Sequence, residues 1–385
     1  HHKRYTMKKV IIAIDSFKGC LTSAEAGEAA EKGIKNINPS CHTSVIPIAD
    51  GGEGLLDVLV TATKGEYITL SAHDPLMKMT ETRYGLSGNG NTAIIEMAAI
   101  SGLPLVPIEQ RNPMLTTTFG TGELIKDALD KGCRDFIIGI GGSATNDAGL
   151  GMLQALGFRF LDKSGHTLGT GGRIMEAVAN IDTSSIHPAL KEAHFMVACD
   201  VANPFHGPDG AAYTFAQQKG ADPEMVQRLD KGLQSLAEVI KRTTGKDLTN
   251  YPGAGAAGGM GGGLLAFLHA ELKPGTELLL EATGFPEKIK GADLIITGEG
   301  KADRQTAMGK VPYGILKEAQ KEHIPVIVLA GCIENLPELN KAGFKGIFSI
   351  APGPITPEEA MKPEFAKENI TRLVSQLCSV ITSFG

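Results

Sequence analysis

The stretch KVIIAIDSFKG, residues 9–19, indicates the fold of this chain. Residues 9–14 form a short apolar run rich in β-branched side chains, which predicts a buried strand. An acid, a hydroxyl and a lysine follow, and residues 22–37 are rich in Ala, Glu and Lys. Thr22 or Ser23 can serve as the N-cap of a helix there. The segment therefore predicts a strand, a polar loop and a helix.

The same alternation of short apolar runs and longer amphipathic segments continues along the chain. Further strands are predicted at residues 44–48, 92–97, 136–140, 195–198, 293–297, 326–330 and 346–350. Further helices are predicted at residues 53–63, 121–131, 223–242, 312–322 and 363–383. This alternation predicts an α/β fold with mostly parallel sheets. Such sheets bind ligands in the loops at the carboxyl ends of their strands.

Length and turn signals predict two domains. The chain has 385 residues, which is more than one ordinary domain holds. Turns at Asp74-Pro75 and Phe285-Pro286 are candidate crossing points between domains. We expect a discontinuous α/β domain of residues 7–74 and 286–385, with residues 75–285 inserted as a second α/β domain.

Composition argues against several classes of protein. A formal net charge of −6 speaks against a nucleic-acid partner, which usually leaves a basic footprint. Six scattered cysteines contain no C-x-x-C pair and suit a reducing cytosol, where we expect the protein. Residues 248–270 carry no charged side chain, but their first half is Gly-rich, so no membrane span is expected. No signal peptide precedes Met7, and residues 1–6 look like a tag remnant.

Two loops after predicted strands combine glycines with acids. In the first, Asp15 could hold a metal ion or a substrate hydroxyl, and Lys18 could neutralise a carboxylate or a phosphate. The alternative there is a capped turn with a solvated lysine. The second loop, ADGGEG at residues 49–54, opens a helix whose N-terminus favours an anion. Asp50 is the best general-base candidate by residue type, and the alternative is a plain Asp-Gly turn.

The loop GIGGSATNDAG, residues 139–149, also follows a predicted strand. Its glycines fit a loose dinucleotide-binding pattern, so an NAD-dependent dehydrogenase has to be considered. That function needs a second strand ending in an acid about 20 residues later. Asp162 lies there, but its surroundings look like a turn. Asn146 and Asp147 are better suited to metal or phosphate chemistry.

Three further segments carry oxygen ligands or clustered glycines. Asp200 follows a predicted strand one turn before Asn203 and offers an oxygen ligand of the kind that Mg²⁺ prefers, although an Asx-turn is the alternative. Residues 297–310 crowd an acid, an amide, hydroxyls and lysines into one loop. Its Lys310 could reach a phosphate. The Gly-rich residues 252–263 could form a backbone nest around phosphates or permit tight helix packing.

The order of these loops carries more information than any one of them. They stand as DSFKG (15–19), PIADGGEG (47–54), residues 139–147, CDVANP (199–204), QKGA (218–221), residues 252–259 and ITGEG (296–300). In this order the chain resembles the bacterial glycerate kinase family over about residues 8–383. Walker A, H-R-D and D-F-G signatures are absent, so any kinase activity belongs to another lineage. Two positions depart from the family's usual residues: Cys20 replaces a Ser and Ala148 replaces a Gly.

The resemblance implies a phosphotransferase with ATP and Mg²⁺ as cofactors and D-glycerate as its small-molecule substrate. It also implies two unlike α/β domains, one interrupted by the other, with the active site in the cleft between them. Members of this family mostly form 2-phosphoglycerate, so 3-phosphoglycerate is the less favoured product. The alternatives are an NAD-dependent dehydrogenase, a non-catalytic sugar-acid binding protein and a kinase for hydroxypyruvate or tartronate.

We expect the loops to divide the chemistry of phosphoryl transfer among them. Asp50 is expected to orient or deprotonate the attacking hydroxyl, with Lys18 and Asp15 as the other catalytic residues. The expected substrate-binding residues are Ser16, Gly51, Gly52 and Glu53. The expected nucleotide-binding residues are Gly141, Gly142, Ser143, Asn146, Gly255, Gly258, Gly298, Glu299 and Lys310. One or more of Asp200, Asp147 and Asp303 are expected to bind the metal ion.

Overall fold

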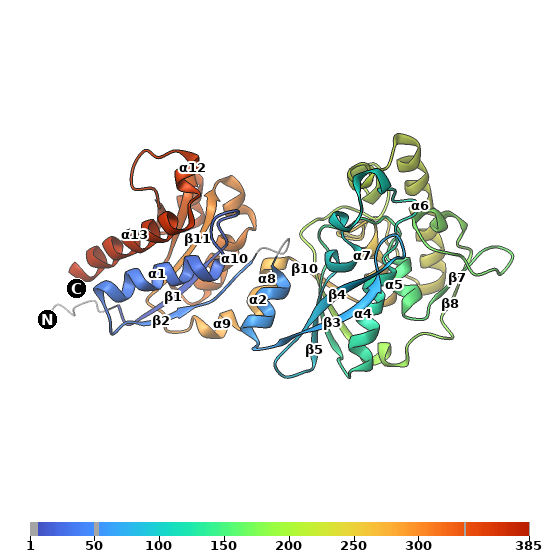
Figure 1. Cartoon of the computed structure of the whole chain (residues 1–385), viewed down its shortest axis with the longest axis horizontal. Coiled ribbons are helices and arrows are strands. Elements are labelled where there is room, and N and C mark those ends of the chain that lie inside the picture. Colours follow the sequence, from blue (N-terminus) through green and yellow to red (C-terminus); the bar gives the residue numbers. More distant parts are fainter. Residues whose placement is uncertain (1–6, 50–53, 335, 385) are drawn as a thin grey trace. The chain divides into compact units, whose positions relative to one another are not determined.

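The computed structural model describes residues 7–49, 54–334 and 336–384. Its contacts divide the chain into two compact units. The first unit consists of two segments, up to Asp50 and from Leu279 onward, and the second unit consists of Gly51 to Leu278. Each unit has its own sheet and its own hydrophobic core, and Figure 1 labels many of their elements.

The first unit is built on a five-stranded parallel sheet in the order β13-β12-β11-β1-β2. Its strands are β1 (Lys9–Ile14), β2 (His42–Val45), β11 (Leu294–Ala302), β12 (Val326–Ile333) and β13 (Gly346–Ser349). The strand predicted at residues 9–14 is confirmed as β1. Because the strands are parallel, their carboxyl ends share one edge, and the loops that follow them gather there.

Helices cover both faces of this sheet. The helices of this unit are α1 (Ser23–Ile37), α9 (Phe285–Lys288), α10 (Val311–Lys321), α11 (Leu336–Ala342), α12 (Pro357–Ala360) and α13 (Pro363–Ser383). Successive strand residues point to opposite faces, and every residue from Val10 to Ile14 is buried. Residues of α1 and α13 share one core cluster with Ile12 and Ile327, and α10 contacts β11 and β12. The apolar run of β1 therefore reflects burial on both sides.

Helix α13 is held close against α1. Gly33 of α1 permits this approach, because a Cβ atom there would lie 2.7 Å from the carbonyl oxygen of Thr371. Thr371 Oγ1 donates to the carbonyl oxygen of Ala29 at 2.8 Å, and Ser375 Oγ donates to that of Gly33 at 3.1 Å. Side-chain hydrogen bonds thus fix α13 in addition to apolar packing.

The second unit is built on a six-stranded mixed sheet in the order β10-β9-β6-β5-β4-β3. Its strands are β3 (Glu66–His73), β4 (Met79–Leu86), β5 (Thr92–Glu96), β6 (Asp135–Gly139), β9 (His194–Ala198) and β10 (Glu271–Lys273), with β7 (Arg159–Leu161) and β8 (Asn180–Asp182) paired separately. Its α-helices are α2 (Leu55–Ala62), α3 (Ala98–Ser101), α4 (Phe119–Asp130), α5 (Leu150–Ala155), α6 (Pro223–Thr244) and α7 (Met260–Phe267), and α8 (Gly275–Ala282) runs across the unit boundary. Strands β5, β6, β9 and β10 are parallel, which gives this unit its own row of carboxyl ends.

The antiparallel strands β3 and β4 differ from the sequence-based expectation, which places no strand at residues 66–86. Strand β3 reads EYITLSAH and is largely accessible along its length, so its polar residues hide the strand pattern. It pairs with β4, which pairs with β5, and both strands therefore belong to the second unit. This pairing places the unit boundaries at 50/51 and 278/279, in contrast to the expected 74/75 and 285/286.

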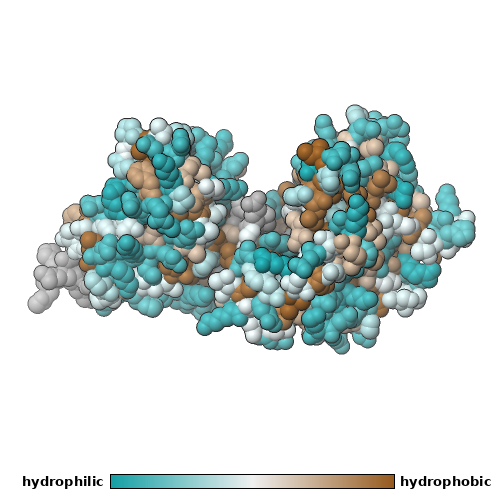
Figure 2. Space-filling model, in the orientation of Figure 1, coloured by the Kyte–Doolittle hydropathy of each residue, from teal (hydrophilic) through white to brown (hydrophobic). Residues whose placement is uncertain are grey.

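Apolar side chains are collected in the two cores. Figure 2 shows many hydrophilic residues on the visible surface, with hydrophobic residues among them. Helix α7, within the uncharged stretch at residues 248–270, is buried in the core of the second unit. Across the described ranges, no helix combines the length and the apolar character that crossing a membrane requires.

Candidate functional site

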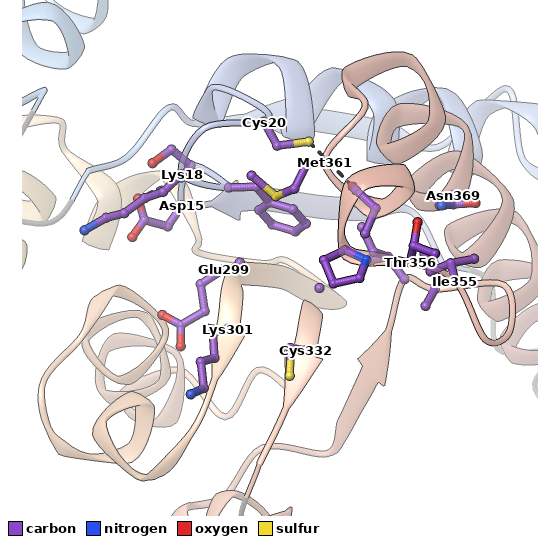
Figure 3. Close-up of a pocket in the computed structure, with 18 of the residues that line it drawn as sticks. Asp15, Lys18, Cys20, Glu299, Lys301, Cys332, Ile355, Thr356, Met361 and Asn369 are labelled. Carbon is purple, nitrogen blue, oxygen red and sulfur yellow. Dashed lines mark hydrogen bonds between the residues drawn. The ribbon is translucent and has the colours of Figure 1, made fainter.

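The first unit has a pocket of about 890 Å³ at the carboxyl edge of its sheet, which we call the first pocket. The loops after β1 and β13 and the ends of β11 and β12 line it (Figure 3). Sequence-predicted residues that line it are Asp15, Ser16, Lys18, Glu299 and Lys310. The fold thus brings together two loops that lie almost 300 residues apart in the chain.

Backbone contacts hold the loop after β1 in a tight turn. Phe17 and Leu21 exchange two N–H···O hydrogen bonds at 2.9 Å, and Gly19 between them has a φ of 73°. The backbone N–H of Asp15 donates to the carbonyl oxygen of Gly298 at 2.9 Å. This bond anchors the loop to β11. Gly298, predicted to bind nucleotide, does not line the pocket, because it packs against β12.

Acidic and basic side chains share one end of the first pocket. Glu299 is only 5% exposed, and Thr306 Oγ1 donates a hydrogen bond to its carboxylate. Burial raises the pKa of Glu299 to about 7, and the negative charge of Asp15 adds to the rise, whereas Thr306 and Lys310 oppose it. The lysines at the pocket are Lys18, Lys301 and Lys310. This end can therefore hold an anion and a cation together.

Asp303, a predicted metal ligand, caps a short helix beside the pocket. Its carboxylate accepts from the N–H of Gln305 at 2.9 Å, at the start of the 3₁₀ helix η7 (Arg304–Met308). Lys310 Nζ lies 4.0 Å from Asp303 Oδ1. Gln305 and Lys310 line the pocket, but Asp303 does not. The structure therefore gives Asp303 a role in shaping the loop.

The other end of the first pocket is largely apolar. Phe17 and Ile350 are each 5% exposed there. Much of the remaining wall comes from residues 351–361, the loop after β13 and helix α12. Sequence patterns give no functional signal for this segment, because its Gly, Pro and Thr residues mark only a turn and the capping box that begins α12.

The second unit has a pocket of about 460 Å³ at the carboxyl ends of β6 and β9, which we call the second pocket. Predicted residues that line it are Gly141, Gly142, Ser143 and Asp200. Gly142 has a φ of 74°, and its carbonyl oxygen accepts from the N–H of Leu103 at 2.9 Å. Asp200 is exposed, and its Oδ1 accepts from the N–H of Gly275 at 2.9 Å. The loops after β6 and β9 were both expected to carry function, and both line the second pocket.

Lys219 lines the second pocket and appears in the sequence only as part of the QKGA motif. The residue is 2% exposed, and its Nζ donates to Ser143 Oγ and to the carbonyl oxygen of Thr145, both at 2.7 Å. Burial lowers the pKa of Lys219 to about 7, and the charge of Asp147 opposes this shift. A buried amine of this kind can bind an anion by gaining a proton.

Asp147 and Asn146 are fully buried and line neither pocket. The Asp147 carboxylate accepts from the N–H groups of Thr118, Gly149 and Gly151 and from Thr118 Oγ1, at 2.9–3.2 Å. These donors occupy its oxygens, so Asp147 joins the start of α4 to the start of α5 and does not offer a metal site. The Asn146 side chain has no hydrogen-bond partner within the described ranges.

The Gly-rich segment at residues 252–263 serves close packing. A Cβ atom at Gly255 would lie 2.1 Å from the carbonyl oxygen of Pro204, and one at Gly258 would lie 2.1 Å from that of Thr145. Gly255 and Gly258 therefore contact other backbone and line neither pocket, contrary to the expected phosphate nest. Of the two interpretations of this segment, tight packing is the one that the structure supports.

Some predicted positions are not described, and the predicted metal ligands are divided between the two units. Asp50, Gly51, Gly52 and Glu53 lie outside the described residues. Within the described ranges, no three His, Cys, Asp or Glu side chains gather in a way that could hold a metal ion. Asp303 belongs to the first unit, whereas Asp147 and Asp200 belong to the second.

The structure does not build the NAD-binding arrangement around β6. Asp162 follows β7 in the separate two-stranded sheet, and its Oδ1 accepts from the N–H groups of Ser164 and His166 at 2.9 and 3.0 Å. The acid therefore lies in a turn, as its sequence indicates. The neighbours of β6 are β5 and β9, so Asp162 does not end a strand beside it.

Comparisons with known proteins agree with this architecture. The profile of the glycerate kinase family matches residues 10–382. The chain is 46% identical to a glycerate kinase from Bacillus subtilis over 97% of each chain, and 44% identical to glycerate 2-kinase from Escherichia coli over 97% of this chain and 98% of the relative. The crystal structure described as glycerate kinase 2 from Salmonella typhimurium LT2 matches with a TM-score of 0.89 and 42% identity, over 98% of this chain and 99% of that one. This chain therefore belongs to the glycerate kinase family and is a kinase enzyme.

Proposed function

We propose that this kinase transfers the terminal phosphoryl group of ATP to the 2-hydroxyl of D-glycerate and forms 2-phosphoglycerate. The observation that carries the proposal is the family match along nearly the whole chain. The Escherichia coli relative is named glycerate 2-kinase, which favours the 2-hydroxyl over the 3-hydroxyl. All six cysteines are free thiols, which suits the reducing cytosol that we propose as the location.

The sizes and charges of the two pockets suggest how the reactants are divided. We assign glycerate to the second pocket, whose 460 Å³ is ample for a three-carbon acid. Lys219 and the backbone N–H groups of Gly141 and Gly142 are the proposed partners of its carboxylate. We assign the triphosphate to the lysines of the first pocket. This division moves glycerate to the loop at residues 141–143, where the sequence-based expectation placed nucleotide, and moves nucleotide to the loop of Asp15, where it placed glycerate. It keeps nucleotide at Glu299 and Lys310, as expected from the sequence.

Mg²⁺ fits the acidic end of the first pocket. Asp15 and Glu299 both line it, and their mutual repulsion contributes to the raised pKa of Glu299. Mg²⁺ usually binds one or two carboxylates together with phosphate oxygens and water. We therefore propose Asp15 and Glu299 as its protein ligands. When bound, Mg²⁺ neutralises negative charge on the phosphates.

The remaining roles follow from charge and from the sequence. Lys18 and Lys310 are proposed to stabilise the negative charge that spreads over the transferred group. Asp50 keeps its proposed role as the base that orients the attacking hydroxyl, on the strength of its position in the ADGGEG loop. Since the transition state of phosphoryl transfer is loose, a carboxylate of ordinary basicity is sufficient for this role.

A coupled assay tests the proposal. The protein is incubated with ATP, Mg²⁺ and D-glycerate, and enolase converts any 2-phosphoglycerate to phosphoenolpyruvate, which absorbs in the ultraviolet. Absorbance with enolase alone is the expected result. Absorbance that appears only after phosphoglycerate mutase is added would indicate the 3-phosphate. Parallel reactions with L-glycerate, hydroxypyruvate and tartronate measure selectivity, and ADP formation that does not depend on any acid would contradict the proposal.

A further inference from the structure

The first pocket is larger and more apolar than a triphosphate alone requires. Its volume of about 890 Å³ is in the range of sites for drug-sized molecules. Its carboxylates and lysines come from the segments at the ends of β1 and β11 and from the loop before α10, whereas residues 350–361 contribute mainly apolar side chains. In Figure 3, Glu299 and Lys301 lie on one side of the view, and Ile355 and Asn369 lie on the other. A ligand that fills this pocket needs a charged part and an apolar part.

Asn369 of α13 is a polar side chain at the apolar end. It is only 5% exposed, and it lines the pocket. Within the described ranges, no protein group makes a hydrogen bond with its side-chain amide. A carboxamide places an acceptor oxygen beside an NH₂ donor. This pair complements a flat ring whose edge carries a donor next to an acceptor, as adenine does with its amino group and adjacent ring nitrogen.

The backbone that carries this amide is fixed before any ligand binds. The next residue, Ile370, is fully buried in the core, and so is Val374 one turn later. Thr371 and Ser375 each donate a hydrogen bond to the backbone of α1. Since these contacts hold α13, the backbone of Asn369 need not be ordered when a ligand binds, which reduces the entropy lost on binding.

We propose that the apolar end of the first pocket binds the adenine ring of ATP and that the Asn369 amide pairs with the donor–acceptor edge of that ring. The inference rests on the proposed function, because it takes ATP as the phosphoryl donor. Phe17, Ile350 and Ile355 provide apolar surface for the ring. The triphosphate then extends toward the end of the pocket that carries Lys18.

Calorimetric titration of the full chain with ADP and with inorganic tripolyphosphate separates binding of the base from binding of the phosphates. Asn369→Leu keeps the size of the side chain but removes the amide. We expect its Kd for ADP to rise about 10- to 100-fold, as for one or two hydrogen bonds lost in a desolvated site. Its Kd for tripolyphosphate should equal that of the wild type. Gln376→Leu is the matched control, because it removes an amide from an exposed position on the same helix, and it should change neither value.

The assignment is overturned if Asn369→Leu binds ADP as tightly as the wild type does. It is also overturned if the variant weakens tripolyphosphate binding as much as ADP binding, because the amide would then act on the phosphates or on the fold. Wild-type protein that binds ADP no more tightly than tripolyphosphate would equally contradict a site for the base.

Cysteine alkylation provides a second test that needs no variant. Cys20 and Cys332 line the first pocket, and Cys199 lines the second. ADP should slow the alkylation of Cys20 and Cys332, followed by mass spectrometry, and should leave Cys199 unchanged. Protection of Cys199 alone would place the nucleotide in the second pocket and overturn the inference.

The two proposals fail in distinguishable ways. If the wild type phosphorylates glycerate but the Asn369 and alkylation results contradict the base site, only the inference is wrong. If the wild type transfers no phosphoryl group to glycerate, the proposed function is wrong. ADP binding and alkylation still test the base site in that case, because neither measurement requires turnover.

Discussion

Replacing Lys219 by Met tests whether this lysine gives up its proton when the chain folds. The side chain is 2% exposed, and its Nζ lies 2.7 Å from Ser143 Oγ and from the carbonyl oxygen of Thr145. Burial lowers its pKa to about 7 from an ordinary value of 10.5. Between these two values, the lysine is mainly neutral in the folded chain and protonated in the unfolded chain.

The sign and size of the effect follow from this difference of one proton. Between about pH 7 and pH 10.5 the unfolded chain binds the extra proton, so the stability of the wild type relative to Lys219→Met rises with pH. The slope for one proton is about 1.4 kcal/mol per pH unit. From pH 8 to pH 9.5 the difference in unfolding free energy should therefore grow by about 2 kcal/mol. Below pH 7 both states bind the proton, and the difference becomes constant.

Urea unfolding followed by far-ultraviolet circular dichroism measures these free energies, since the chain contains no tryptophan. Lys231→Met is a matched control, because it removes the same charge from an exposed position on α6. The reasoning is refuted if the difference in unfolding free energy between wild type and Lys219→Met is the same at pH 8 and at pH 9.5. That outcome would mean that Asp147 keeps the buried ammonium group charged in the folded chain.

Three further substitutions test the assigned roles. Asp147→Asn should lower the free energy of unfolding by about 2–4 kcal/mol, because the amide NH₂ group would face backbone N–H donors. Unchanged stability in urea together with weaker Mg²⁺ binding would instead indicate that Asp147 is a metal ligand. Lys18→Ala should lower kcat/KM for ATP about 100-fold, because it removes positive charge at the phosphates. Its Tm should not change, because the side chain is exposed. A kcat/KM equal to that of the wild type would exclude Lys18 from the site. Asp50→Asn should lower kcat by about 10²- to 10⁴-fold, and a kcat within a few-fold of the wild type would rule it out as the base.

The sequence predicts strands that are buried on both faces better than strands that are half accessible. β1 and β12 are continuous apolar runs, and their predicted starts agree with the structure. β3 is accessible along most of its length and carries charged and hydroxyl residues, which also occur in loops and helices. The unit boundary near residue 50 depends on the pairing of β3 with β4, and no local pattern reports that pairing.

Some residues of the candidate site can be identified from local sequence, whereas the roles of others depend on contacts between distant parts of the chain. Asp15, Lys18 and Glu299 can be found from the sequence because charged residues follow strands and accompany glycines. Lys219 is different, because its burial and its bond to Ser143 depend on residues 76 positions apart. Asp147 looks like a metal ligand locally, yet its oxygens are occupied by donors that include a threonine 29 residues earlier.

Asn369 illustrates what an amphipathic helix conceals. Its sequence neighbours indicate a helix with one apolar face, and a lone amide near that face carries no special signal. Only the packing of α13 against α1 and the opening of the first pocket give the residue a candidate role.

The most direct test of the central claim is the ³¹P NMR spectrum of the product formed from ATP, Mg²⁺ and D-glycerate. The phosphorus of 2-phosphoglycerate couples to the single proton on carbon 2 and gives a doublet. The phosphorus of 3-phosphoglycerate couples to the two protons on carbon 3 and gives a triplet. We predict a new phosphomonoester doublet that grows as ATP is converted to ADP. A triplet would contradict the assigned hydroxyl, and the absence of any new phosphomonoester signal would contradict phosphorylation of glycerate.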